Sequence, residues 1–256
     1  MLALISPAKT LDFDSQIATD SFSQSDHLSQ SRKLIQRMKQ FSGQDLSRLM
    51  KVSSAIAELN VDRFRHWKTP FNQSNSRQAI FAFRGDVYIG LDAHSMDDAN
   101  LCYAQQHLRV LSGLYGLLRP LDLIQAYRLE MGTRVDIGSA NNLYQFWDDK
   151  ITRAINKQLK DIQSEFLINL SSNEYFKSVQ LKKLKATVIT PVFKDFKNEE
   201  YKVIGFFAKK ARGAMARYMI DNELKDPEQL KLFNWEGYEY RAGSSTDVQW
   251  IFTRRL

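Results

Sequence analysis

The stretch Val110–Ile124, VLSGLYGLLRPLDLI, limits what this chain can fold into more than any other segment. It is a run of large apolar residues, yet it carries glycine at 113 and 116 and proline at 120. Glycine destabilises a helix interior, and proline removes a donor and clashes with the preceding turn, so one continuous helix is excluded. The segment must contain a turn, and the question is what that turn does.

Two interpretations of the turn remain open. We predict a helix over 95–112, opened by a capping box at Ser95–Asp98, and a short helix over 120–125. Helix, glycine hairpin and helix are the outline of a motif that binds the DNA backbone, with Gly113 and Gly116 exposing N–H groups and Arg119 adding charge. The alternative is a compact turn between core helices, in which glycines permit close packing.

Positive charge is concentrated in one segment. The 256-residue chain has 36 Lys and Arg against 29 Asp and Glu, a net charge of +7. Residues 177–217 hold eleven of the basic residues and only three acids, Asp195, Glu199 and Glu200. Such a concentration favours a polyanionic partner, nucleic acid before an anionic membrane, although a solvated lysine face would look the same.

Part of this charge lies on a predicted helix over 208–222. Lys210, Gly213 and Arg217 stand at i, i+3 and i+7, which places them on one stripe. Small residues between long cations would let a phosphate strand approach the helix. We therefore predict four DNA contacts here: Lys209, Lys210, Arg212 and Arg217. The alternative is an exposed, alanine-rich helix that needs no function to form.

Two other candidates follow predicted strands. Lys9 comes just after the strand 2–5, and Glu174, Tyr175 and Lys177 come just after the strand 166–170. Together they could form the site of an enzyme acting on nucleic acid or a nucleotide, with a general acid or base among them. Amphipathic helices also produce such triplets by chance, and Lys9 and Lys177 could instead line a DNA-binding cleft.

The remaining patterns predict one mixed α+β domain spanning residues 1–256. No repeat, low-complexity tract or long linker divides the chain. Helical periodicity covers 28–41, 45–67 with a break near 52–53, and 143–159 with Asn142 as its cap. Further strands are predicted at 187–193 and 201–207 as a hairpin, and near the end of the chain in YEYR and VQWIFT.

Several classes of protein are disfavoured. Cys102 is the only cysteine, so no intrachain disulfide can form, and MLALISPAKT has too short an apolar run and no basic leader for a signal sequence. No apolar stretch approaches the ~20 residues that span a bilayer. The four histidines are scattered without metal-ligand spacing. We expect a cytosolic protein with no membrane association, no metal site and no cofactor.

Eight blocks of sequence together resemble one family from end to end. They are LISPAKTLD, GDVYIGL, AQQHLRVLSGLYGLLRPLDL, YRLEMGTR, LYQFW, NEYFKSV, FFAKKARGAMARY and FNWEGY. The chain is similar to YaaA, the bacterial peroxide-stress resistance family. Two small departures are Ala126, where proline is expected, and the triplet Ser171–Asn173.

The resemblance implies a family-specific mixed fold with a positively charged cleft and a helix-hairpin-helix motif. It also implies a cytosolic protein, induced by peroxide stress, that binds duplex and branched DNA without strong sequence preference. The family is further linked to keeping intracellular free iron low. We therefore expect a phosphate-contacting DNA-binding protein, with two alternatives: an enzyme acting on nucleic acid or a nucleotide in the same cleft, and a protein that limits free iron.

Overall fold

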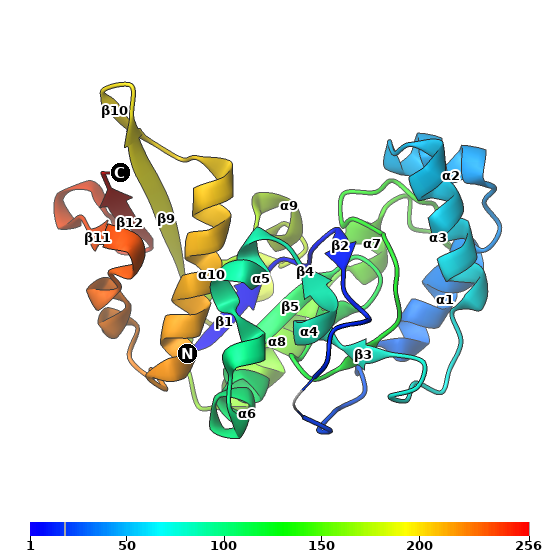
Figure 1. The fold of residues 1–256 in the computed structure, drawn as a ribbon, viewed down its shortest axis with the longest axis horizontal. Helices are drawn as coiled ribbons and strands as arrows, with labels where there is room; N and C mark the ends of the chain where they lie inside the picture. The colour runs from blue at the N-terminus through cyan, green and yellow to red at the C-terminus, as the bar shows by residue number, and fades with distance from the viewer. Residues whose placement is uncertain (18, 256) are drawn as a thin grey trace.

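A mostly parallel sheet organises the computed structural model, which describes residues 1–17 and 19–255. Its order is β11-β12-β9-β8-β1-β5-β6, with β10 added to β9 (Figure 1). The parallel strands are β12 (Gln249–Arg254), β9 (Thr187–Lys197), β8 (Phe166–Leu170), β1 (Leu2–Ile5) and β5 (Leu108–Ser112). The antiparallel ones are β6 (Gly116–Leu118), β10 (Glu200–Lys202) and β11 (Glu239–Tyr240). The fold is thus mixed α/β. The predicted mixture of helices and strands is confirmed, but the strands pair mainly in parallel, which the predicted α+β class did not include.

The central strands are short apolar runs because both of their faces are covered. All four residues of β1 are buried, and so are four of the five in β8. The predicted strands 2–5 and 166–170 are confirmed. The predicted hairpin is confirmed in part: β9 continues to Lys197, but β10 ends at Lys202, and the chain then enters α10 (Gly205–Asp221).

Helices pack on the sheet and beside it. They are α1 (Leu28–Met38), α2 (Gly43–Met50), α3 (Ser54–His66), α4 (Ala79–Ala82), α5 (Asp86–Leu91), α6 (Asp98–His107), α7 (Leu143–Trp147), α8 (Lys150–Asp161) and α9 (Asn173–Phe176). Two-residue strands β2 (Thr10–Leu11) and β4 (Phe83–Arg84) pair together, as do β3 (Arg77–Gln78) and β7 (Leu123–Ile124). In Figure 1, α1–α3 lie to the right of the sheet, and α10 lies across its left half.

Helix boundaries follow local capping. The predicted break near 52–53 is confirmed, with Lys51 left-handed at φ 53° and Ser53 capping α3. The predicted helix 143–159 is capped by Asn142 but divides into α7 and α8 at Asp148, where φ is 46°. Asp97, rather than Ser95, caps α6. Along the described residues, no helix has the length and apolarity that crossing a bilayer requires.

The strand order places a topological switch beside β1. After β1 the chain adds β5 on one side, whereas after β8, on the other side of β1, it adds β9. Connections that diverge in this way open a crevice outside the carboxyl ends of the two strands, and open α/β sheets bind their ligands there. The carboxyl ends of β1 and β8 are therefore the first place to search for a site.

Candidate functional site at the carboxyl edge of the sheet

The glycine turn lies inside a buried β-hairpin. β5 and β6 pair antiparallel, with Ser112 opposite Gly116, and both glycines are buried. The Trp147 indole N–H donates to the Gly113 carbonyl at 2.9 Å. Gly116 has φ +71°, and a Cβ there would lie 2.6 Å from the Trp147 ring. The turn is thus shaped by packing against α7.

The predicted helix-hairpin-helix at this position is therefore wrong. α6 ends at His107, residues 108–112 form β5, and the predicted helix 120–125 is replaced by β7. The cause is tertiary: β5 is buried throughout and pairs with β1, so sheet formation overrides local helical periodicity. In this structure the backbone of Gly113 and Gly116 does not face solvent as a phosphate contact requires.

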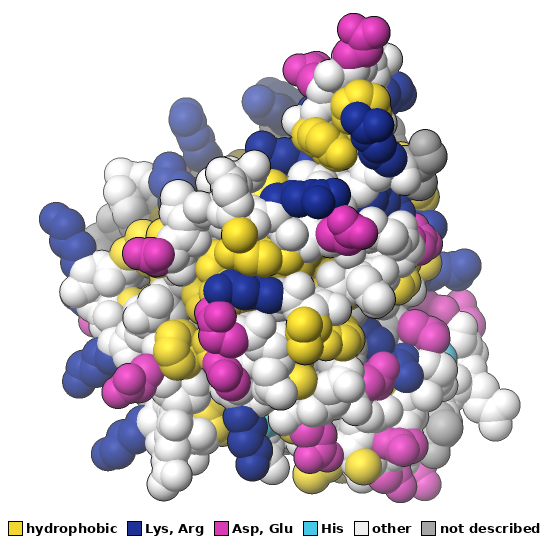
Figure 2. Space-filling view, turned by 90° about the vertical axis from the view of Figure 1, so that its left-hand side faces the viewer, with side chains coloured by type: hydrophobic (Ala, Val, Ile, Leu, Met, Phe, Trp, Pro, Cys, Tyr) yellow, Lys and Arg dark blue, Asp and Glu magenta, His cyan; other side chains and the backbone are white. Residues whose placement is uncertain are grey.

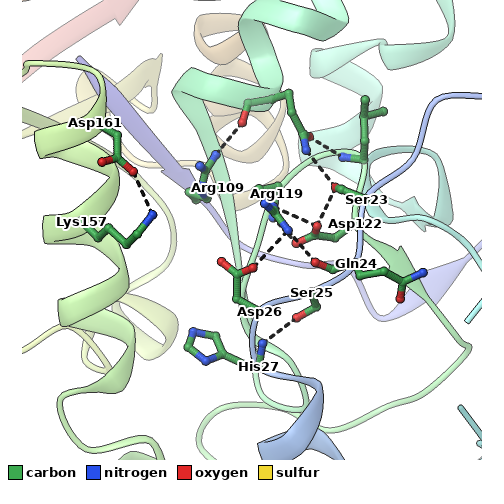
Figure 3. A network of polar contacts seen from close by, with 12 residues as sticks. Ser23, Gln24, Ser25, Asp26, His27, Arg109, Arg119, Asp122, Lys157 and Asp161 are labelled. Carbon is green, nitrogen blue, oxygen red and sulfur yellow. Dashed lines mark hydrogen bonds and ion pairs between the residues drawn. The ribbon is translucent and has the colours of Figure 1, made fainter. Parts of the chain in front are cut away.

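Arg119 belongs to a structural network at the opposite end of the β5–β6 hairpin from the glycine turn, beside Arg109 at the amino end of β5 (Figure 3). Its guanidinium binds Asp122 at 3.0 Å and Asp26 at 3.2 Å, and donates to the Gln24 carbonyl. Asp122 is 1% exposed, and burial raises the pKa of its carboxyl while Arg119 opposes that rise. Asp122 also accepts from Ser23 at 2.7 Å. Through these hydrogen bonds and ion pairs, Arg119 and Asp122 hold the segment 23–26 against the residues that follow β6.

The stripe on α10 faces another helix. Gly213 packs on α5, where an added Cβ would meet the Val87 carbonyl oxygen at 1.8 Å. Arg217 binds Asp221 at 2.6 Å and also bonds to the Asp92 carbonyl and the Ser95 hydroxyl. The small residues predicted to admit a phosphate strand instead admit α5. Arg212 is half-buried, and desolvation lowers its pKa.

Eight of the eleven basic residues of 177–217 divide between the two ends of the sheet. Lys182, Lys183 and Lys185 precede β9 and so lie at its amino end. Lys194, Lys197 and Lys202 belong to the β9–β10 hairpin at the opposite end, and Lys209 and Lys210 lie in the first half of α10. The cations therefore do not gather around 113–119, because β5 and β9 are separated by β1 and β8.

The carboxyl edge does bring distant residues together. The Ser172 N–H donates to the Ser6 hydroxyl at 2.9 Å, which joins the loops after β8 and β1. Beyond Ser6, Lys9 binds Glu130 at 3.0 Å, and Glu130 also binds Arg128 at 3.0 Å. Two of the sequence-predicted candidates, Lys9 and Glu174, flank the same short segment, residues 128–132.

A pocket of about 590 Å³ opens beside this segment. Glu174 borders it and accepts from the Gly132 N–H at 2.9 Å. The charged side chains that line it are Arg48, Lys51 and Arg134, with Glu130 and Glu174. Cations therefore outnumber carboxylates. Glu130 is paired with Lys9 and Arg128, and Arg48 is paired with Asp45 outside the pocket lining.

All three cations of this pocket are exposed, but Arg48 binds Asp45 at 2.8 Å, which leaves Lys51 and Arg134. In the described part of the chain, neither forms an ion pair. Sequence reasoning missed both as site residues. Arg134 stands in the YRLEMGTR block, which carries the family resemblance but no local pattern of a binding site, and Lys51 follows α2 without any local signal of function.

Three tyrosines, Tyr88, Tyr127 and Tyr175, are buried beneath the carboxyl edge. The Tyr88 hydroxyl donates to the Ser6 carbonyl at 3.1 Å, and Tyr127 lies 2.6 Å from the Ser112 hydroxyl. Desolvation raises the pKa of Tyr88, Tyr127 and Tyr175, so all three stay neutral at physiological pH. Tyr175, predicted as part of an enzyme site, is a buried supporting residue rather than an exposed acid.

Lys177 and Lys209 complete the edge. The Lys177 ammonium lies 5.2 Å from the centroid of the Tyr144 ring, whose hydroxyl donates to the Glu174 carbonyl at 2.9 Å. Lys209 lies 3.8 Å from Asp86 at the start of α5, next to Gly85, which packs against Ala8. Four predicted residues, Lys9, Glu174, Lys177 and Lys209, thus lie along one edge.

Comparison with known proteins places the chain in a family. The profile described as peroxide stress protein YaaA matches residues 1–244. This chain belongs to the peroxide stress protein YaaA family. Among similar proteins, the UPF0246 protein of Colwellia psychrerythraea is 54% identical over 255 residues, covering 100% of this chain and 99% of that protein.

Two further relatives are similarly close. The UPF0246 protein of Aliivibrio fischeri is 53% identical over 254 residues, covering 99% of this chain and 98% of its own length. That of Teredinibacter turnerae is 51% identical over 255 residues and covers 100% of both chains. The end-to-end resemblance to the YaaA family is confirmed, and it agrees with a role in peroxide stress.

Proposed function

We propose that this YaaA-family chain is a cytosolic nucleic-acid-binding protein of the peroxide-stress response that holds phosphates along the carboxyl edge of its sheet. The observation that supports this most is the pocket lined by Arg48, Lys51 and Arg134, in which cations outnumber carboxylates. Phosphate contacts need cations that are not already committed to protein carboxylates, and Lys51 and Arg134 meet that requirement.

The rest of the edge extends this surface. Lys9 binds Glu130 within the segment 128–132, and Lys177, just after α9, lies over the Tyr144 ring. Lys209 pairs with Asp86, whose neighbour Gly85 packs against Ala8. The interface differs from the one predicted from the sequence. Lys51 and Arg134 replace the glycine turn, Arg119 and Arg217 as the principal contacts. Lys177 is retained, whereas Lys9 binds Glu130 and Lys209 lies 3.8 Å from Asp86, so a phosphate would have to displace these carboxylates to bind either lysine.

The test is charge reversal of the two pocket cations that form no ion pair among the described residues, Lys51→Glu with Arg134→Glu. For a duplex, log K falls with log[salt] by about 0.9 per phosphate neutralised, so loss of two contacts should make the slope shallower by about 1.8. Affinity should fall for all duplexes alike, because no base is read. Fluorescence anisotropy across a salt series measures both quantities.

The matched control is Lys182→Glu with Lys185→Glu. These lysines are exposed, come from the basic segment, and lie at the opposite end of the sheet. Their reversal makes the same change in net charge, so it should affect binding less and leave the slope near that of the wild type. Equal effects of the two double variants would refute the proposed edge, and no wild-type binding at low salt would refute the function.

An enzyme acting on nucleic acid or a nucleotide is the second candidate. It is favoured by one observation, that Lys9 and Glu174 both border the segment 128–132 at the topological switch. The same binding reactions, supplemented with Mg²⁺ or Mn²⁺, can be scored for cleaved DNA or altered nucleotide. Turnover would favour this candidate, and intact substrate would favour binding alone.

A further inference from the structure

The β9–β10 hairpin extends past the carboxyl edge and stands at the upper left of Figure 1. Its two-residue turn, Asn198 and Glu199, is left-handed at φ 54° and 63°, as tight hairpins require. Within the described residues, β10 pairs with β9 alone. The hairpin therefore presents side chains that the sheet does not cover.

Aromatic and aliphatic side chains are exposed at the base of this hairpin. Tyr201 stands opposite Phe196, with ring centroids 5.1 Å apart, and is 38% exposed. Val203 is 51% exposed, and Phe206, in the first turn of α10, is 49% exposed. Single exposed apolar residues are common, but three within six residues form a patch. We call Tyr201, Val203 and Phe206 the hairpin patch.

Cations lie on the rings of this region. The Arg255 guanidinium is 4.1 Å from the centroid of the Phe196 ring, and the Lys210 ammonium is 4.6 Å from that of Phe206. Lys197 and Lys209 are exposed nearby along the chain. Each cation lies over one face of its ring and adds positive potential there, so a stacked base would use the opposite face.

Within the hairpin the exposed acidic residues are at the tip, and beside it Glu236, which is 49% exposed, is paired with Arg254. Glu199 and Glu200 occupy the tip, and Lys202 binds Glu200 at 3.0 Å. Asp195 is fully buried in an ion pair with Arg254. Figure 2 faces this side and shows the acidic tip above hydrophobic and basic side chains. Below the tip, therefore, exposed rings and cations stand together.

We infer that the hairpin patch stacks unpaired bases of the nucleic acid held along the carboxyl edge. This inference rests on the proposed function and adds a preference for DNA with single-stranded tails. Single-strand binding surfaces combine aromatic rings, on which bases stack, with cations that hold the backbone. Paired bases hide their faces within a duplex, so only unpaired ones can use Tyr201 and Phe206. A purely apolar protein partner would gain nothing from Lys210 and Arg255.

The experiment compares two DNAs, a blunt duplex and the same duplex with a single-stranded tail of about ten nucleotides, a length typical of one binding surface. The tail carries 2-aminopurine, whose fluorescence falls on stacking. In the variant Tyr201→Ala with Phe206→Ala, affinity for the tailed DNA should fall about tenfold or more, as expected from losing base stacking. The fluorescence change should be lost, and blunt-duplex affinity should stay the same.

Three controls accompany this variant. The exchange Tyr201→Phe with Phe206→Tyr keeps both rings and should retain binding of the tail. Leu232→Ala removes a side chain that is 73% exposed elsewhere and should change nothing. Circular dichroism and thermal melting confirm that each variant is folded.

The outcomes separate the two proposals. If the wild type binds neither DNA, both the proposed function and this inference are overturned. If the wild type binds both DNAs and the double alanine variant binds them equally well, the hairpin patch is not a stacking surface, and the proposed function stands. An equal loss on both DNAs would also overturn the inference, because stacking on unpaired bases predicts a loss on the tailed DNA alone.

Discussion

Replacing Gly116 by alanine separates a structural turn from a DNA-contacting one. Gly116 is buried in the β5–β6 hairpin at φ +71°, and a Cβ would lie 2.6, 2.8 and 2.9 Å from three carbons of the Trp147 ring. Both the backbone and the packing therefore oppose any side chain. If Gly116 instead contacted a phosphate, the substitution would weaken DNA binding and leave the free energy of unfolding nearly unchanged.

The magnitude follows from two effects. A left-handed backbone costs an L-residue about 1–2 kcal/mol. Overpacking of a fitted core costs about 1–3 kcal/mol more, because the Trp147 indole is held by its hydrogen bond to Gly113 and cannot move freely. Together they lower the free energy of unfolding by about 3 kcal/mol, which for a chain of this size lowers Tm by about 6–12 °C.

Gly138→Ala is the matched control. Gly138 also has a positive φ, +60°, but nothing lies within 4 Å of an added Cβ, so only the backbone cost of about 1 kcal/mol applies. Urea denaturation gives both free energies, and DNA titration below the transition gives the affinity of the folded fraction. A Gly116→Ala variant as stable as Gly138→Ala, or one with wild-type stability and reduced DNA affinity, would refute the packing argument.

Two further predictions concern buried charge. Arg119→Ala should lower the free energy of unfolding by about 1–3 kcal/mol, because Asp122, which is 1% exposed, loses its charged partner. The same variant should leave the salt slope of DNA binding unchanged. Burial lowers the pKa of His27 from its ordinary 6.5, so the unfolded chain binds the proton more readily, and stability falls as the pH drops below 6.5. His27→Phe should reduce that fall between about pH 7 and pH 5.5 in urea titrations, leaving the part due to His107, whose pKa burial also lowers. A pH dependence identical to the wild type would show that His27 does not titrate as its burial implies.

Local signals in the sequence predicted much of the fold. The apolar runs at 2–5 and 166–170 form buried parallel strands, and Asn142 caps the helix that follows it. Predictions failed where a segment is compatible with two structures. Residues 108–112 continue the helical periodicity of α6, but they form β5 because β1 offers a partner strand over a hundred residues away.

The sequence by itself determined that the chain folds as one mixed α/β protein, that residues 110–124 must turn, and that it belongs among YaaA-like proteins. These properties depend on residues close together in the chain, whose spacing and conformational limits can be read directly. Only the tertiary structure decided which cations are available to a ligand. Arg119 and Arg217 are bound to neighbouring acids, whereas Lys51 and Arg134 meet at one pocket although 83 positions separate them. Electrostatic interactions act through space, so their outcome depends on how distant segments pack.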